Sequence, residues 1–366
     1  MGKIFYPKMR AALIGSLPLE SHKEATRLVL EYTPEIPLWV QLPVYPAEGM
    51  LEQFLPGFPG VCKKDGKLFI NSADDSFEEK VTGFYEAYLA ILEDPSLLGD
   101  SIFALDTMSA AGFFEFMKQA EHVSDKMVAV KGQITGPFTF ATGIVDEKGR
   151  ALFYDDQLRD IAVKIIAMKA RWQARRLSEL GRPVIIFFDE PALAAFGSSA
   201  YISISKDDVS ACFAEVFDAV HAEGGLAGVH VCANAQWDIV LDSSADIVSF
   251  DSYSFFDKFI LYGSHIKRFV EQEKIIAWGI VPTGDKEHIA KESVESITGL
   301  WRNQAARVEE LGVDRKTIER LSLITPSCGT GSLDIKSAMK VLELTAGVSR
   351  ALRDNNNSQR SGVLNG

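Results

Sequence analysis

The sequence is poor in cysteine and in positive charge. It has four cysteines in 366 residues, and its 38 Lys and Arg are outnumbered by 50 Asp and Glu, which gives a formal net charge of −12. Affinity for nucleic acids comes largely from clustered Lys and Arg that displace the counterions of phosphates. The acidic balance therefore argues against a nucleic-acid partner.

Long apolar runs are also missing. The longest apolar run at a predicted strand is Val184–Phe188, far below the roughly 20 residues that a membrane-spanning helix needs. The first residues, "MGKIFYPKMRAALIG", include lysines but no apolar segment of signal-peptide length. We therefore expect a cytoplasmic protein with no membrane partner.

Four thiols in such a chain are better explained as core residues or metal ligands than as a disulfide framework. Cys212 lies three residues after Val209, at the spacing of a core-facing helix, which predicts a buried position. Cys62 lies in a segment rich in Gly, Pro and charge, and we expect a packed or exposed thiol there. Cys232 and Cys328 remain as candidate metal ligands.

Short strand-like runs alternate with longer helical patterns along almost the whole chain. The nine candidate strands are Met9–Ile14, Ile36–Leu42, Ile102–Leu105, Met127–Ile134, Val184–Phe188, Leu226–Val231, Ile247–Phe250, Ile275–Ile280 and Ser322–Thr325. The helical patterns between them are Ser21–Tyr32, Ser76–Leu92, Asp155–Leu180, Lys206–Ala222, Ala235–Ser243, Phe255–Gln272, Lys286–Leu311 and Leu333–Asp354.

This alternation indicates an α/β fold with parallel strands and helical crossovers. Eight of the nine runs fit a (β/α)8 TIM barrel, and the extra run is Ile102–Leu105 or, as the other candidate, Met9–Ile14. A doubly wound open sheet is the alternative, but no G-x-G-x-x-G follows the first strand. We expect a single catalytic barrel over residues 1–354, an inserted excursion at 49–75 with a hairpin around Gly66, and a disordered tail at 355–366.

Polar side chains of a TIM barrel gather at the carboxyl ends of its strands, where the active site lies. His230 and Cys232 end one predicted strand and, being two residues apart, face the same side. Cys328 closes the last strand, at the same mouth. Two thiolates and one imidazole suit Zn²⁺ and leave a fourth position for Asp251, a water or a substrate atom. The pair His-x-Cys alone is more often a polar residue beside a buried thiol, so the metal hypothesis depends on Cys328.

Six segments carry a resemblance to a known family. "GSLP", "KGQITGPFTF", "FFDEPAL", "VHVCAN", "ADIVSFDS" and "TPSCGTG" occur in this order, and over Met9 to Arg350 the chain resembles the catalytic barrel of cobalamin-independent methionine synthase. The wider superfamily also holds uroporphyrinogen decarboxylase and zinc thiol methyltransferases of methanogens. Full-length methionine synthases have a second, preceding barrel that this sequence lacks, so the chain resembles the short "core" form.

The resemblance implies roles for particular residues. The two cysteines and the histidine named above match the zinc ligands of the family, and Asp251 falls where methionine synthases place a glutamate ligand. Asp189 matches the aspartate that receives the amino group of homocysteine, Ser16 matches a serine near its carboxylate, and Glu190 is a further substrate-binding residue beside Asp189. Without the resemblance, Asp189 and Glu190 are equally well explained as a helix-capping and surface pair.

The activity that the resemblance implies is a zinc-dependent methyl transfer to the thiol of homocysteine, in methionine biosynthesis. Zinc deprotonates a bound thiol near neutral pH, and two further thiolates keep its sulfur nucleophilic. Methionine synthases carry a histidine after the seventh strand that serves the folate leaving group, whereas here Thr283 lies near that place and the nearest histidine is His288. We therefore hypothesise a methyl donor on a corrinoid partner protein, with methyltetrahydrofolate as the alternative donor.

Three other functions stay open at this stage. A methyltransferase acting on another small thiol, such as coenzyme M, shares the zinc site but does not need Asp189 as an anchor for an amino group. A metal-free lyase like uroporphyrinogen decarboxylase needs arginines at the mouth, and these are scarce near the predicted strand ends. A non-catalytic barrel that binds a small molecule or a corrinoid protein is the third.

Overall fold

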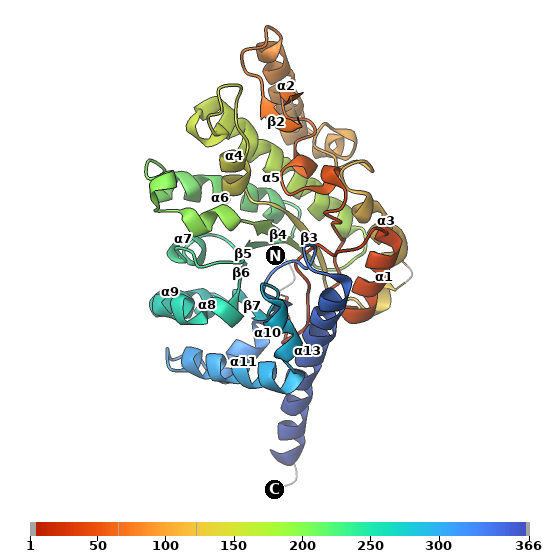
Figure 1. Ribbon diagram of the computed structural model, residues 1–366, viewed down its shortest axis with the longest axis vertical. Coiled ribbons are helices and arrows are strands. Elements are labelled where there is room, and N and C mark those ends of the chain that lie inside the picture. The colour runs from red at the N-terminus through yellow and green to blue at the C-terminus, as the bar shows by residue number, and fades with distance from the viewer. Residues whose placement is uncertain (1–4, 65, 122, 364–366) are drawn as a thin grey trace.

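The computed structural model has six parallel strands at its centre (Figure 1). The structure describes residues 5–64, 66–121 and 123–363, with the side chains of 124 and 355–363 left aside. The strands lie in chain order as β3 (Val130–Thr135), β4 (Val184–Asp189), β5 (Leu226–Val231), β6 (Ile247–Phe250), β7 (Ile275–Val281) and β8 (Ser322–Pro326). They are buried on both faces, as expected for apolar strands covered by crossover helices. The predicted α/β class and six of the predicted strands are confirmed.

Two extended segments lie at the edges of this sheet. Isolated parallel bridges join Ala11 to Ile324 of β8, and Leu38 to Lys131 of β3. A third bridge joins the two segments to each other, between Ser16 and Gln41. Eight regular strands are therefore not confirmed, because six strands are formed and the remaining two runs make single bridges.

The backbone explains why these two segments are irregular. Pro37 has no N–H to give to a ladder, and it contributes only its carbonyl, which accepts from the Lys131 backbone N–H at 2.9 Å. In the first segment, Lys8 and Met9 have positive φ angles of 50° and 62°, so a regular strand cannot begin before Arg10. Ile102–Leu105, predicted as the extra run, lies in turns and loop.

Helices cover the sheet, mainly along the side where α4 to α11 follow one another in Figure 1. Their bounds are α1 His22–Tyr32, α2 Phe77–Glu93, α3 Ala111–Ala120, α4 Pro137–Gly143, α5 Asp156–Ser178, α6 Lys206–His221, α7 Asp238–Leu241, α8 Ser252–Phe259, α9 Gly263–Glu271, α10 Lys286–Lys291, α11 Val294–Glu309, α12 Arg315–Arg320 and α13 Ile335–Val363. The helices α3, α4 and α12 were not predicted. In the described part of the chain, no helix combines the length and apolarity needed to cross a membrane.

Two of the long predicted helices are each divided in the structure. The pattern Phe255–Gln272 forms α8 and α9, separated by a 3-10 turn at Ile260–Tyr262. The pattern Lys286–Leu311 forms α10 and α11, because Ser293 caps a new helix through a reciprocal capping box with Ser296.

The last helix is longer than predicted. We expected helix to Asp354 and a disordered tail from 355, but α13 continues to Val363. The structure thus places 355–363 in this helix, while 364–366 lie outside the described residues. Extending an existing helix adds a backbone hydrogen bond for each residue fixed, and no proline interrupts 335–363.

The excursion at 49–75 folds over the mouth beside β3. It contains the predicted hairpin, formed by β1 (Val61–Lys64) and β2 (Lys67–Ile70), with Gly66 in the turn at φ +79°. The Thr135 hydroxyl at the end of β3 donates to the Met50 carbonyl at 2.5 Å. The excursion thus forms part of the wall around the strand ends.

Candidate metal centre

Three of the predicted ligands meet at the carboxyl ends of β5 and β8. His230 is in β5, and Cys232 is the first residue after the end of that strand. The two residues are two positions apart, so strand alternation turns both side chains inward. Cys328 lies two residues after β8. One ligand atom from each of the three residues lies within 4.8 Å of the others.

The two nitrogens of the His230 ring have different surroundings. The Nδ1 atom lies 3.0 Å from the hydroxyl of Ser249, which pairs with His230 across the β5–β6 ladder. The Nε2 atom is buried and has no hydrogen-bond partner among the described residues. Buried polar atoms are nearly always satisfied, and a metal ligand is the ordinary reason for a ring whose second nitrogen is held in this way.

The two thiols share a proton in the metal-free site. The hydrogen bond from Cys328, followed by the influence of His230, lowers the pKa of Cys232 to about 4. The same interaction raises the pKa of Cys328, which remains the protonated partner. Cys232 is thus ready to bind a metal as a thiolate, and Cys328 becomes a second thiolate when a cation replaces its proton.

Asp189 ends β4 and pairs with His230 in the parallel ladder. Its Oδ1 atom is buried and has no hydrogen-bond partner among the described residues. Burial raises the pKa of Asp189 to about 6, although His230 and Lys131 act in the opposite direction. Asp189 therefore offers an unused acceptor oxygen beside the metal cluster.

Lys131 lies deeper in the sheet and was not singled out from the sequence. Its side chain is fully buried, its Nζ donates to the Ile14 carbonyl at 2.5 Å, and it lies 4.4 Å from the centre of the Phe187 ring. Burial lowers its pKa to about 7. In the sequence, a lysine within an apolar run that is predicted to be a buried strand indicates a residue with a special role, because lysine is almost never fully buried without a partner.

Asp251 is not part of the three-residue cluster. Its Oδ1 accepts a hydrogen bond from the Ser254 backbone N–H at 2.8 Å and caps the start of α8. An aspartate three residues before a free N–H at a helix start commonly makes this bond. The carboxylate that was expected as a fourth ligand therefore has a structural partner.

Glu190 faces a helix and not the metal cluster. Its two carboxylate oxygens accept from the backbone N–H groups of Phe138 and Thr139, at 2.9 and 2.8 Å, and from the Thr139 hydroxyl at 2.6 Å. These donors form the first turn of α4, so Glu190 attaches that helix to the end of β4. The side-chain contacts give Glu190 a structural role in place of the expected substrate contact.

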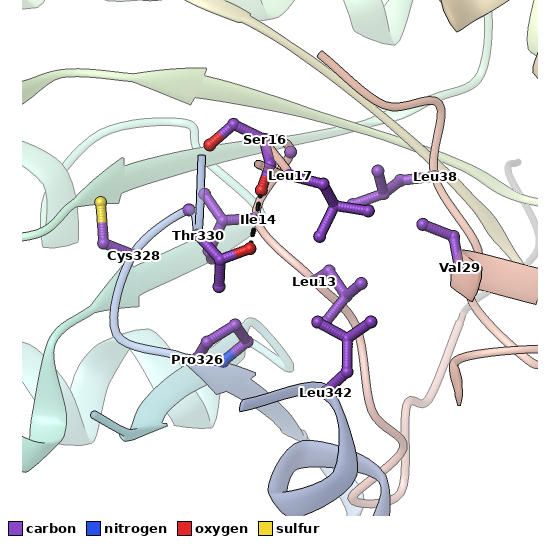
Figure 2. A pocket seen from close by; sticks show the side chains of 12 residues that line it. Leu13, Ile14, Ser16, Leu17, Val29, Leu38, Pro326, Cys328, Thr330 and Leu342 are labelled. Atoms are coloured by element: carbon purple, nitrogen blue, oxygen red, sulfur yellow. Dashed lines mark hydrogen bonds between the residues drawn. The ribbon is translucent and has the colours of Figure 1, made fainter. Parts of the chain in front are cut away.

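Ser16 lies near Cys328 at the edge of a small cavity of about 10 Å³, which is partly open to solvent. Its hydroxyl accepts from the Gly331 N–H at 3.1 Å. Figure 2 shows Cys328 and Thr330 on one side of this cavity and apolar side chains, among them Val29 and Leu38, on the other. Of the three clustered residues His230, Cys232 and Cys328, Cys328 lines this cavity.

No protein-family model and no curated protein matches this chain. Among the solved structures, two of the pneumococcal protein StrH match. One, of its tandem GH20 exo-β-D-N-acetylglucosaminidase modules, has 12% identity and a TM-score of 0.45 and covers 94% of this chain and 85% of that one. The other, described for N-glycan recognition and hydrolysis, has 13% identity and a TM-score of 0.49, with coverage of 98% and 88%. A Cellulomonas fimi endo-β-1,4-mannanase double mutant matches with 14% identity and a TM-score of 0.37, covering 90% and 76%.

These matches correct the expected activity. The three structures are of glycan-hydrolysing proteins and not of methyltransferases. Methyl transfer to homocysteine, the place in methionine biosynthesis, and the corrinoid or folate donors are therefore not carried forward. At these TM-scores the likeness gives no argument for glycan hydrolysis by this chain either, so the chemistry must be argued from the site.

Proposed function

We propose that this chain is a zinc-dependent enzyme that acts on a small molecule, with His230, Cys232 and Cys328 as the metal ligands. The observation that carries the proposal is the cluster itself, in which a ring nitrogen of His230 and the two sulfurs lie within 4.8 Å of one another. The buried Nε2 atom of His230 has no hydrogen-bond partner among the described residues, which supports it as the ligand atom. A bound cation satisfies all three atoms at once.

The donor set fits zinc. Two thiolates with one imidazole are soft and borderline ligands, which favours Zn²⁺ over the oxygen-preferring Mg²⁺ and Ca²⁺. Three protein ligands are typical of catalytic zinc, whereas structural sites have four. Asp251 is engaged at the start of α8, which supports a fourth position open to an exchangeable ligand. Zinc held in this way supplies Lewis-acid chemistry and lowers the pKa of that ligand.

Asp189 is the protein group that we assign to the other end of the ligand. Its buried Oδ1 accepts a hydrogen bond from an N–H, an O–H or a cationic group, and the backbone ladder holds it beside His230. Ser16 is a second polar group on the Cys328 side of the mouth. The proposed substrate is thus a small polar molecule with a metal-binding atom and a hydrogen-bond donor.

We further infer that the metal lies at the mouth of a closed (β/α)8 barrel. The bridges from β8 to Ala11, from Ser16 to Gln41 and from Leu38 to β3 support a ring in which two irregular segments complete six strands. The resemblance to the methionine synthase barrel agrees with this architecture and remains a prediction.

Metal analysis of the purified protein tests the proposal. We expect about one zinc per chain and X-ray absorption that reports two sulfur ligands and one nitrogen ligand. Cys232→Ser and Cys328→Ser should each lose most of the zinc, because serine is a poor zinc ligand. Cys62→Ser is the matched control, since Cys62 lies in the β1–β2 hairpin, and it should keep the metal.

A wild-type protein that does not bind zinc after incubation and desalting would refute the proposal. Equal zinc content in Cys328→Ser and Cys62→Ser would also contradict it.

A further inference from the structure

Ser249 forms a hydrogen bond with the His230 ring, and the direction of this bond determines which ring nitrogen is available to a metal. The hydroxyl lies 3.0 Å from Nδ1. Ser249 is fully buried, so water does not compete for this bond. The two residues are opposite each other in the β5–β6 ladder, which fixes their separation through the backbone.

A neutral imidazole carries one proton on one of its two nitrogens, and only the other nitrogen can bind a metal. When Nδ1–H donates to the Ser249 hydroxyl, the Nε2 lone pair is free, and Nε2 is the buried atom that lacks a partner in the described structure. We propose that Ser249 is a positioning residue that holds His230 in the Nδ1–H tautomer and so presents Nε2 to the metal. This inference rests on the proposed metal centre.

The opposite arrangement is the competing explanation. A serine hydroxyl can also donate, and it would then place the proton of the ring on Nε2, which could not bind a metal. In that arrangement the buried Nε2–H would be left unsatisfied, because Nε2 forms no hydrogen bond with any described residue, the two neighbouring thiols included, and an unsatisfied buried donor is costly. The surroundings of the ring therefore favour the Nδ1–H form.

Two matched variants separate the hydroxyl from the space that it fills. Ser249→Thr keeps the hydroxyl and adds one methyl group, and the residue opposite Ser249 on β7 is the small Ala277. Ser252→Ala removes another fully buried hydroxyl near the mouth, one that has no hydrogen-bond partner among the described residues. These variants serve as the rescue and the control for Ser249→Ala.

The first measurement is zinc affinity by competition with a chromogenic chelator. Loss of a group that orients a metal ligand typically costs about 10-fold to 100-fold in affinity, and we expect this for Ser249→Ala. Ser249→Thr and Ser252→Ala should stay within a few-fold of wild type. Unchanged affinity in Ser249→Ala would overturn the inference, and so would a loss in Ser249→Thr as large as in Ser249→Ala, because shape and not the hydroxyl would then matter.

The second measurement needs no metal. The ring ¹⁵N shifts of His230 in metal-free wild type, at mildly alkaline pH and assigned by their loss in His230→Gln, report the tautomer directly. We expect Nδ1–H, and a dominant Nε2–H form would overturn the inference whatever the zinc result. If wild type binds no zinc but shows Nδ1–H, the proposed function fails while the assignment of the Nδ1–H tautomer stands. This arm also decides the question if Ser249→Ala does not fold.

Discussion

Gly136→Ala tests the structural role of Glu190. The glycine precedes α4, and its φ and ψ angles of −69° and 156° are comfortable for alanine. An added Cβ would lie 2.2 Å from both Cδ and Oε1 of Glu190, where contacts below about 3 Å do not occur. The carboxylate would have to move away from the Phe138 and Thr139 N–H groups that it now holds.

The size of the effect follows from these contacts. Overpacking a buried site costs about 1–3 kcal/mol, and leaving one buried backbone donor unsatisfied costs about 1–3 kcal/mol more. We therefore expect Gly136→Ala to lower the free energy of unfolding by about 2–6 kcal/mol. Urea unfolding followed by tryptophan fluorescence measures it.

The double-mutant cycle identifies the cause. In a Glu190→Ala background the added methyl group has room, so the further cost of Gly136→Ala should fall below about 1 kcal/mol. A single variant within about 0.5 kcal/mol of wild type, which is the range of unremarkable surface changes, would refute the reasoning. An equal cost in both backgrounds would show that the backbone, and not Glu190, is responsible.

Two further predictions concern the rest of the mouth and the packing below it. In Gly329→Ala the added Cβ would lie 2.3 Å from the Ser16 hydroxyl, so we expect weaker zinc binding at the neighbouring Cys328, restored in part by adding Ser16→Ala. Chelator competition measures the zinc affinities of the single and the double variant. Equal affinities in wild type and both variants would contradict this. The hydrogen bond to Asp246, 2.8 Å away, raises the pKa of His221 above its usual value of 6.5, so its stabilisation is fully present below pH 6.5 and disappears as the pH rises through the folded-state value. His221→Asn should therefore lower the free energy of unfolding by about 0.5 kcal/mol below pH 6.5, since solvent screens this partly exposed pair. At alkaline pH the substitution should have no effect. A loss of stability that grows as the pH rises would show that the predicted direction of the pH dependence is wrong.

The six strands could be predicted because buried parallel strands are continuous apolar runs with polar residues at their carboxyl ends. The first two runs have the same composition but form only isolated bridges. Pro37 has no N–H to donate, and the positive φ angles of Lys8 and Met9 prevent a regular strand before Arg10. Those angles are set by packing and turn geometry, which a hydrophobic pattern does not contain. Only the proline was visible in the sequence as a warning.

Helix α4 was missed for a different reason. It has only seven residues, Pro137 to Gly143, all but two of which are buried, so it shows no amphipathic pattern. Its first turn is satisfied by Glu190, about fifty positions further along the chain. A helix whose cap comes from a distant strand end cannot be found from local start signals. The same contact gives Glu190 a structural partner that the local sequence does not indicate.

The clustering of His230, Cys232 and Cys328 was predictable from strand alternation and from the rule that barrel strands have functional residues at their carboxyl ends. Strand alternation also predicts an inward-facing side chain at Ser249, because Ser249 lies two residues before Asp251 and therefore on the same face of the strand. Asp251 was the more attractive candidate because carboxylates bind zinc and hydroxyls rarely do. Asp251 instead accepts a hydrogen bond from the backbone N–H of Ser254, only three residues away. Such local side-chain to backbone bonds compete with metal binding by an aspartate at a helix start.

The proposed ligand set would give a Lewis-acid centre, but it does not define a reaction. Catalytic zinc with one histidine and two cysteines serves hydride transfer in alcohol dehydrogenase and hydrolytic deamination in nucleobase deaminases, so the neighbouring groups must decide the chemistry. Here the neighbour with free hydrogen-bonding capacity is Asp189, whose Oδ1 lacks a partner in the described structure. A substrate that only binds the metal leaves this buried oxygen unsatisfied, which costs about 1–3 kcal/mol. A substrate that also donates to Asp189 avoids that cost, so it should bind about tenfold or more tightly than an analogue without the donor.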